Sequence, residues 1–149
     1  MAQASSSPCD APEYRQFDFW VGEWAVHNPK GQQVGTNRIE KVEHGCAIVE
    51  NWTNARGVTG RSINVYRPAT RTWTQAWAGS DGGTLILEGR FTAGKMILEG
   101  KSLGAKSEPL RDRVTWSQLP DGKLRQFWEQ SADEGKTWTV AFDGIYSHR

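Results

Sequence analysis

Apolar and polar residues alternate along most of this chain, in short segments that are separated by turn signals. A period of two is typical of a strand with one buried face, because successive side chains point to opposite sides of a sheet. The segments recur at a spacing of roughly 8–12 residues, which is typical of an antiparallel meander. They predict about ten strands. The first ends at His27, and the others cover residues 34–42, 46–54, 61–67, 72–78, 84–91, 96–102, 111–119, 124–131 and 137–146.

The connections between these strands are tight, and only residues 13–18 are expected to form a short helical turn. An open meander would expose two sheet edges, which closure of the sheet removes. We therefore predict an all-β protein built as a single antiparallel up-and-down β-barrel of about ten strands.

The chain has 149 residues, a length that suits one domain with a sizeable core. We assign residues 13–149 to the barrel and residues 1–12 to a flexible N-terminal arm. The stretch from Phe17 to Trp24 is half aromatic. We expect it to form the base of the barrel, closed by its own aromatic side chains.

The charges are almost balanced, with 18 basic and 17 acidic residues and a formal net charge of +1. This balance gives no electrostatic reason to expect binding to nucleic acid or to an anionic membrane. No apolar run approaches the roughly 18 residues that a membrane-spanning helix needs. We expect a small-molecule ligand as the partner. The sequence is compatible with both a monomer and a homodimer.

The two cysteines, Cys9 and Cys46, permit one disulfide, and two free buried thiols are the alternative. The first residues are small and polar and lack the apolar core of an intact signal peptide. They look like the remnant left after cleavage at an Ala-x-Ala site, with Met1 added for expression. On this interpretation the protein is periplasmic or secreted, where a disulfide between Cys9 and Cys46 can persist.

One face of the alternating strands combines aromatic and amide side chains. We predict that this face points into the barrel, because it carries four tryptophans that would otherwise meet water. The alternative is that this face is exposed and the aliphatic face forms the core. The predicted inward residues are Glu50, Trp52, Ser62, Asn64, Tyr66, Trp73, Gln75, Trp77, Leu87, Gly89, Arg113, Thr115, Gln126 and Trp128.

An inward face of this composition predicts a pocket for a small, partly aromatic molecule with a hydrogen-bonding or acidic group. Arg113 would bind a carboxylate or phenolate, the amides would fix the orientation, and the tryptophan rings would stack on the ligand. A single β-bulge would reverse these assignments within a strand. The predicted ligand-binding residues are Trp52, Asn64, Tyr66, Gln75, Trp77, Arg113, Gln126 and Trp128.

The segment Gly22-Glu23-Trp24 resembles the Gly-x-Trp signature of lipocalins and related calycins. A wider pattern opens with Phe17-Asp18-Phe19-Trp20-x-Gly22-x-Trp24 and includes Trp73-x-Gln75-x-Trp77 and Arg125-Gln126-x-Trp128-Glu129. It resembles a bacterial family of small lipocalin-like proteins of unknown function, over most of the chain after residue 12. The resemblance implies a calycin-like barrel in which the signature tryptophan packs across the closed base. It implies export in many members and supplies no reaction.

A second motif, Ser131-x-Asp133-x-Gly135-x-Thr137-Trp138, is similar to the Asp-box of sialidases and other β-proteins. Its chemistry is local, because the carboxylate accepts N–H groups of the turn and the glycine takes a positive φ. We interpret it as a device that stabilises one hairpin, since a single copy does not make a propeller.

Three functions are compatible with this barrel. The leading hypothesis is binding of a small hydrophobic or aromatic ligand. The second is a cofactor-independent isomerase, cyclase or lyase, in which Tyr66 or Glu50 is the general acid or base and Arg113 stabilises an anionic intermediate. The third is a structural or interaction protein whose barrel centre is filled. We expect no cofactor and no metal, because the three histidines are far apart in the sequence.

Overall fold

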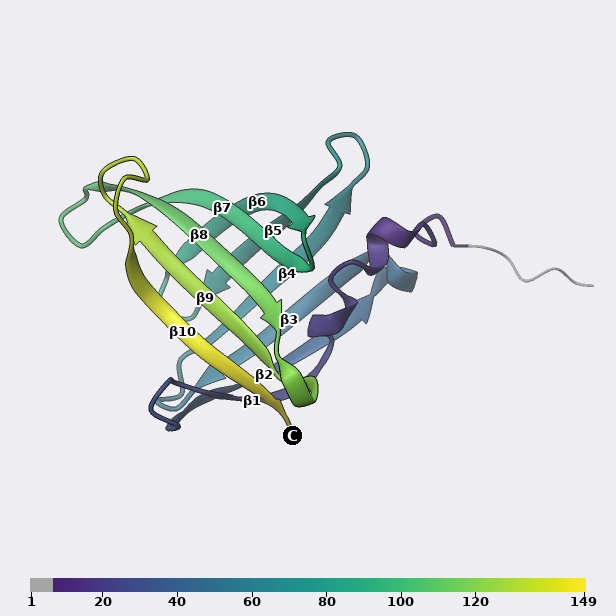
Figure 1. Cartoon of the computed structure of the whole chain (residues 1–149), viewed down its shortest axis with the longest axis horizontal. Coiled ribbons are helices and arrows are strands. Elements are labelled where there is room, and N and C mark those ends of the chain that lie inside the picture. Colours follow the sequence, from purple (N-terminus) through teal and green to yellow (C-terminus); the bar gives the residue numbers. More distant parts are fainter. Residues whose placement is uncertain (1–6) are drawn as a thin grey trace, which may run out of the picture.

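The computed structural model describes residues 7–149 and shows a closed antiparallel barrel of ten strands (Figure 1). Each strand pairs with the next one along the chain, and β1 pairs with β10 to close the sheet. The predicted ten-stranded up-and-down barrel is therefore confirmed. The strands are β1 (Gly22–His27), β2 (Gln33–Val42), β3 (Ala47–Asn54), β4 (Thr59–Arg67), β5 (Thr72–Gly79), β6 (Thr84–Thr92), β7 (Lys95–Leu103), β8 (Pro109–Gln118), β9 (Leu124–Ser131) and β10 (Thr139–His148).

The ladder between β9 and β10 has a register shift between Val140 and Phe142. These two residues would share a face in a regular strand. The bulge breaks this alternation, so Val140 is 59% exposed while Phe142 packs against the core. A second shift between Val26 and His27 interrupts the ladder between β1 and β2.

The N-terminal segment closes one end of the barrel with two short 3₁₀ helices, η1 (Pro12–Arg15) and η2 (Asp18–Trp20) (Figure 1). Phe17 and Trp20 are fully buried, and their rings stack with centroids 4.7 Å apart. Trp116 of β8 contacts both of them, at centroid distances of 5.2 and 5.5 Å. The aromatic stretch thus forms the base of the barrel, as its composition predicts.

Covalent and polar contacts fix this segment to the barrel. The disulfide between Cys9 and Cys46 ties it to the connection between β2 and β3, which confirms the predicted bridge. Lys41 of β2 donates to the backbone oxygen of Tyr14 and forms an ion pair with Asp18. Residues 7–12 therefore lie against the end of the barrel, while residues 1–6 of the predicted arm lie outside the described part of the chain.

Trp24 lies buried above this base. Its indole N–H donates to the backbone oxygen of Trp20 at 2.8 Å, which joins β1 to the end of η2. The imidazole of His148, near the end of β10, stacks on the Trp24 ring with centroids 4.0 Å apart. The backbone N–H of Arg149 donates to the oxygen of Glu23. The last residues of the chain are therefore held at the closed end.

The Asp-box motif forms the connection between β9 and β10. Asp133 accepts hydrogen bonds from the hydroxyl and backbone N–H of Thr137 and from the hydroxyl of Ser131. These bonds lower the pKa of Asp133 to about 2. Gly135 has a φ of 90°, which its missing side chain permits. The motif is a local turn device, as its chemistry predicts.

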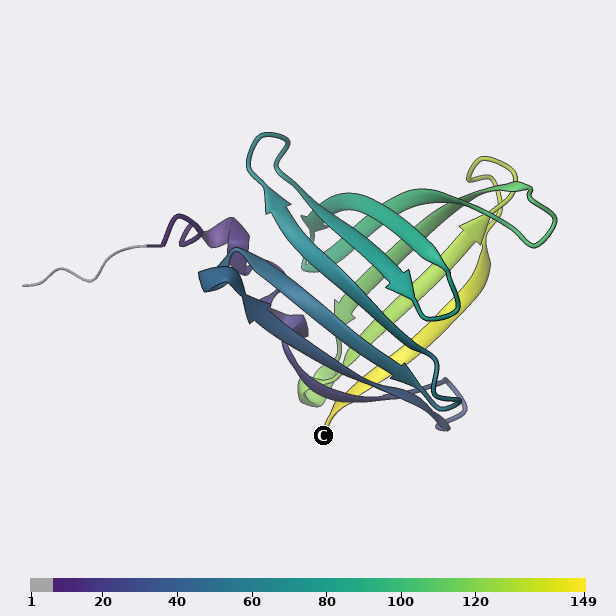
Figure 2. The same cartoon turned by 180° about the vertical axis from the view of Figure 1, so that it is seen from behind.

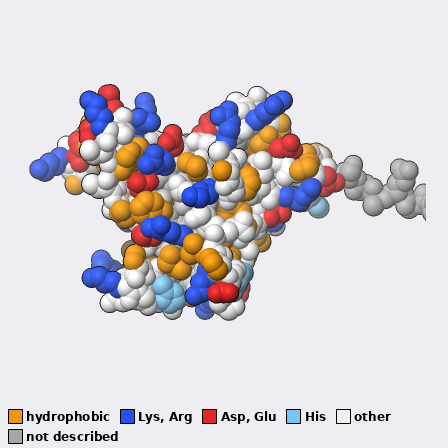
Figure 3. All heavy atoms as spheres, viewed as in Figure 1, with side chains coloured by type: hydrophobic (Ala, Val, Ile, Leu, Met, Phe, Trp, Pro, Cys, Tyr) orange, Lys and Arg blue, Asp and Glu red, His pale blue; other side chains and the backbone are white. Residues whose placement is uncertain are grey.

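The face of the molecule seen in Figure 3 mixes acidic and basic side chains without a large patch of one sign. Seen from behind, β2 to β5 form the near wall (Figure 2). Among residues 7–149, no helix is long and apolar enough to cross a membrane.

Candidate functional site

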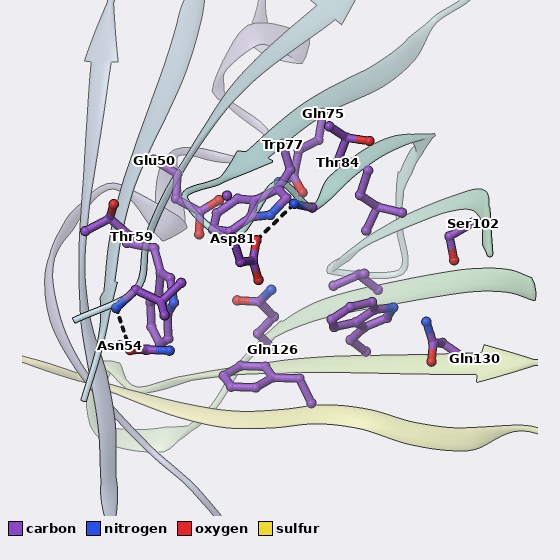
Figure 4. A pocket seen from close by; sticks show the side chains of 18 of the residues that line it. Glu50, Asn54, Thr59, Gln75, Trp77, Asp81, Thr84, Ser102, Gln126 and Gln130 are labelled. Atoms are coloured by element: carbon purple, nitrogen blue, oxygen red, sulfur yellow. Dashed lines mark hydrogen bonds between the residues drawn. The ribbon is translucent and has the colours of Figure 1, made fainter. Parts of the chain in front are cut away.

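A cavity of about 410 Å³ occupies the barrel at the end opposite the N-terminal helices (Figure 4). It extends from Glu50 and Tyr146 in the interior to the loops that join β3 to β4 and β5 to β6. Its walls alternate aromatic rings with amide, hydroxyl and carboxyl groups. The lining residues are Glu50, Trp52, Asn54, Val58, Thr59, Gln75, Trp77, Gly79, Asp81, Gly83, Thr84, Leu85, Ser102, Leu103, Val114, Gln126, Trp128, Gln130, Phe142 and Tyr146.

Two glycines set the width of this cavity. The ring of Trp52 lies directly against Gly35 of the neighbouring strand, and the ring of Trp77 lies against Gly60 in the same way. A methyl group at either glycine would overlap the ring. Because both indoles lie directly against adjacent backbone, they form part of the wall of the cavity without filling it.

A hydrogen-bond network forms the inner end of the cavity. Glu50 is 5% exposed, and its two oxygens accept bonds from Asn37 and Ser62, each at 2.7 Å. Asn37 also donates to the hydroxyl of Tyr146, which in turn donates to Gln126. The network thus links β2, β3, β4, β9 and β10, and it presents one carboxyl group to the cavity.

Asn64 extends this network beneath the cavity. Its amide nitrogen donates to Ser62 and to the backbone oxygen of Ile48, and its amide oxygen accepts from Gln75 at 2.8 Å. Asn64 is fully buried and does not line the cavity. Since its polar atoms have partners within the protein, its task is to position Ser62 and Gln75.

Burial governs the ionisation of this network. It raises the pKa of Glu50 above its usual 4.5, and the bonds from Asn37 and Ser62 oppose this shift. Burial, and then the nearby charge of Glu50, raise the pKa of Tyr146. Tyr146 is therefore neutral at physiological pH, and Glu50 takes up a proton more readily than an exposed carboxyl group does.

The raised pKa of Glu50 predicts a pH-dependent stability. Its contribution is fully present below about pH 4.5, the ordinary value, and is lost as the pH rises through the folded-state pKa. We expect Glu50→Gln to gain stability relative to the parent protein as the pH rises, by at most about 1.4 kcal/mol per pH unit. Urea unfolding from about pH 5 to pH 8 measures this difference. The control Glu99→Gln, at an exposed position of β7, should follow the parent profile, and a parallel profile for Glu50→Gln would contradict the prediction.

The structure brings together most of the predicted inward residues. Five of the eight predicted ligand-binding residues line the cavity: Trp52, Gln75, Trp77, Gln126 and Trp128. Glu50 also lines it, and Asn64 lies beneath it. Trp73 and Leu87 are buried in the core.

Strand β8 has the opposite parity from the predicted one. Arg113 lies on the outer face, where its guanidinium pairs with Glu129 at 3.2 Å and lies over the ring of Trp138 at 4.0 Å. Its inward neighbours are Asp112, Val114 and Trp116, all buried. Arg113 therefore does not reach the cavity, and the same parity places Thr115 outside. The sequence does indicate the observed parity of β8, because the apolar residues Val114 and Trp116 share one face of the strand.

Tyr66 lies at the closed end of the barrel. Its ring packs edge-on against Tyr14, with centroids 5.2 Å apart, and against Trp73 at 5.9 Å. It is absent from the cavity wall. The three candidate catalytic residues, Tyr66, Glu50 and Arg113, are thus separated. The tyrosine that joins Glu50 in one network is Tyr146, which is not among the predicted site residues.

Among the described residues, no group of three or more His, Cys, Asp or Glu side chains is placed to hold a metal ion. Comparisons of the chain with models of known protein families and with curated proteins find no match.

Proposed function

We propose that the protein is an exported, lipocalin-like binding protein that holds a small, partly aromatic molecule in its barrel. The observation that carries this proposal is the cavity of about 410 Å³, walled by Trp52, Trp77, Trp128 and Phe142. Ligand pockets commonly measure about 300–1,000 Å³ and combine aromatic walls with a few polar groups. The disulfide between Cys9 and Cys46 supports export, because such bonds persist in oxidising compartments.

The contrast between the two ends of the barrel further supports binding. Phe17, Trp20 and Trp116 are buried and pack against one another at the closed end. At the other end, Trp52 and Trp77 lie against glycines and line the cavity. A barrel with a purely structural role gains stability by filling such a space.

Native mass spectrometry on protein purified without refolding tests the proposal. We expect an additional mass that disappears on denaturation, or, for protein isolated empty, saturable quenching of tryptophan fluorescence by a panel of small aromatic molecules. Three of the eight tryptophans line the cavity, so a bound ring changes a large part of the signal. Absence of both signals would contradict the proposal.

Gly60→Ala is expected to weaken binding of any ligand found in this way by about tenfold or more, because the new methyl group pushes the Trp77 ring into the cavity. Gly94→Ala is the matched control. Gly94, in the turn between β6 and β7, has a φ of 80° and no atom near its missing side chain, and neither it nor its neighbours line the cavity. Calorimetric titration of both variants checks this prediction, and equal affinities would contradict it.

A second function, proton-transfer catalysis, is favoured by one observation. Glu50 reaches the cavity with a raised pKa, a property of general acids and bases. A cofactor-independent isomerase or lyase could use it on a bound aromatic or lipid-like substrate. Turnover of a bound ligand that Glu50→Gln abolishes while binding persists would distinguish the enzyme from the binding protein.

A further inference from the structure

In the described part of the chain, the carboxyl groups that line the cavity have no basic side chain beside them in its wall. Two carboxyl groups, those of Glu50 and Asp81, belong to its wall, and no Lys, Arg or His among residues 7–149 lines it. Figure 4 shows Glu50, Asp81 and Gln126 on different sides of the same space. Asp81 belongs to the loop between β5 and β6 and is exposed, so its carboxyl group lies at the mouth of the cavity.

Three basic residues of the barrel strands are paired away from the cavity. Arg113 pairs with Glu129, and Arg125 pairs with Asp143 at 2.8 Å, both on the outer face. Lys41 is bound at the closed end by Asp18 and the backbone of Tyr14. Because these cations already have partners, none is free to turn inward and neutralise an anionic ligand.

A third carboxyl group lies behind the cavity wall. Asp112 is 1% exposed, and one of its oxygens accepts the indole N–H of Trp128 at 2.9 Å and the amide of Gln130 at 3.0 Å. Its other oxygen has no partner among the described residues, and neither has the buried hydroxyl of Ser102 on the cavity wall. Because the indole N–H of Trp128 donates to a carboxyl oxygen, this bond polarises the indole ring.

The aromatic wall favours the same charge. The face of an indole or phenyl ring carries negative potential and attracts cations within roughly 6 Å, with tryptophan the strongest. Trp52, Trp77 and Trp128 present such rings, and Trp128 is further polarised by Asp112. An anion in this cavity would meet π faces and carboxyl groups with no positive partner, which makes its desolvation unfavourable.

We propose that the cavity selects an organic cation, an amine or quaternary ammonium on a small aromatic or apolar body, and rejects carboxylates. The ammonium would lie among the tryptophan faces and the carboxyl groups of Glu50 and Asp81. This inference rests on the proposed binding function and specifies its ligand class. It also replaces the acidic ligand that the sequence predicted, because the residue expected to bind the acid, Arg113, lies outside the barrel.

Three probes of the same shape and different charge test this selectivity: tryptamine, tryptophol and indoleacetate. We expect calorimetric titration at neutral pH to show tryptamine binding at least about tenfold more tightly than tryptophol. Indoleacetate should bind most weakly. Equal affinities, or tightest binding of indoleacetate, would overturn the proposed ligand class and leave the binding function intact. Absence of binding by all three at about 10 mM would overturn both.

Variants that replace the carboxyl groups with amides test whether the preference for tryptamine arises in the cavity. Asp81→Asn should reduce the ratio of tryptamine affinity to tryptophol affinity by about threefold. The double variant, which carries both Asp81→Asn and Glu50→Gln, should lose most of the preference for tryptamine. Asp81 is exposed in a loop, so its variant folds even where Glu50→Gln is destabilised. Glu99→Gln removes the same charge from the outer wall and should leave the ratio unchanged. A preference that persists in the double variant would contradict the assignment to these carboxyl groups.

Discussion

Replacing both Cys9 and Cys46 with serine is expected to lower the free energy of unfolding by about 4 kcal/mol. The bond joins residues separated by 37 positions, and its loss restores the chain entropy of that loop to the unfolded state. The loss corresponds to a decrease in Tm of roughly 10–15 °C for a domain of this size. Thermal unfolding followed by circular dichroism measures it, with the reduced parent protein as a second route to the same state.

The control for this prediction is Asp18→Asn, which removes the ion pair with Lys41 and keeps the disulfide. The Asp18 side chain is 39% exposed, so we expect a change of at most about 1 kcal/mol. A double serine variant that loses no more than this control would show that the aromatic contacts alone hold the N-terminal segment in place.

Trp20→Ala is expected to cost about 3–5 kcal/mol, because it leaves a large cavity at the closed end. Trp20 is fully buried, and its ring contacts both Phe17 and Trp116. The neighbouring rings belong to separate elements, which limits how far they can collapse into the space. Urea unfolding gives the free energy directly.

Trp138→Ala is the matched control for the closed end. Trp138 is only partly buried in the hairpin between β9 and β10, where its indole donates to Gly135 and its ring lies under Arg113. We expect a loss of about 1 kcal/mol there. A similar loss for both variants would contradict the view that the buried base carries the stability of the barrel.

The strand pattern and the aromatic base could be predicted from the sequence, because both depend on local alternation and on where large apolar residues gather. The residues that line the cavity on strands β3, β5 and β9 could also be predicted from the sequence. Trp52, Trp77 and Trp128 each fixed the inward face of their strand, and with it the amides Gln75 and Gln126. A tryptophan constrains strand parity strongly, since its exposure is costly.

Arg113 shows where this reasoning fails. On β8 the expected chemistry, a cation for a carboxyl group, pointed to one face, while the apolar residues Val114 and Trp116 pointed to the other. Burial decided the outcome, because an unpaired guanidinium in the interior costs more than an outward one that pairs with Glu129.

Tyr66 and Tyr146 illustrate a second limit. Both lie on inward-facing positions, yet one packs at the base and the other reaches the cavity. The parity of a residue within its strand determines which face of the sheet its side chain occupies, but not its height along the barrel axis. That height depends on the register of ten ladders and on the N-terminal segment, which fills one end. The contact between Asn37 and Tyr146 joins residues 109 positions apart and is not local information.

Both ends of the described chain lie at the closed end of the barrel. Ser7 donates to the backbone of His44, and the backbone N–H of Arg149 donates to Glu23. A tether, a fusion partner or a solid support attached through either end would therefore leave the opposite rim facing solution. The protein could be immobilised as a sensor, or displayed on a particle, with its entrance unobstructed and without redesign of any loop.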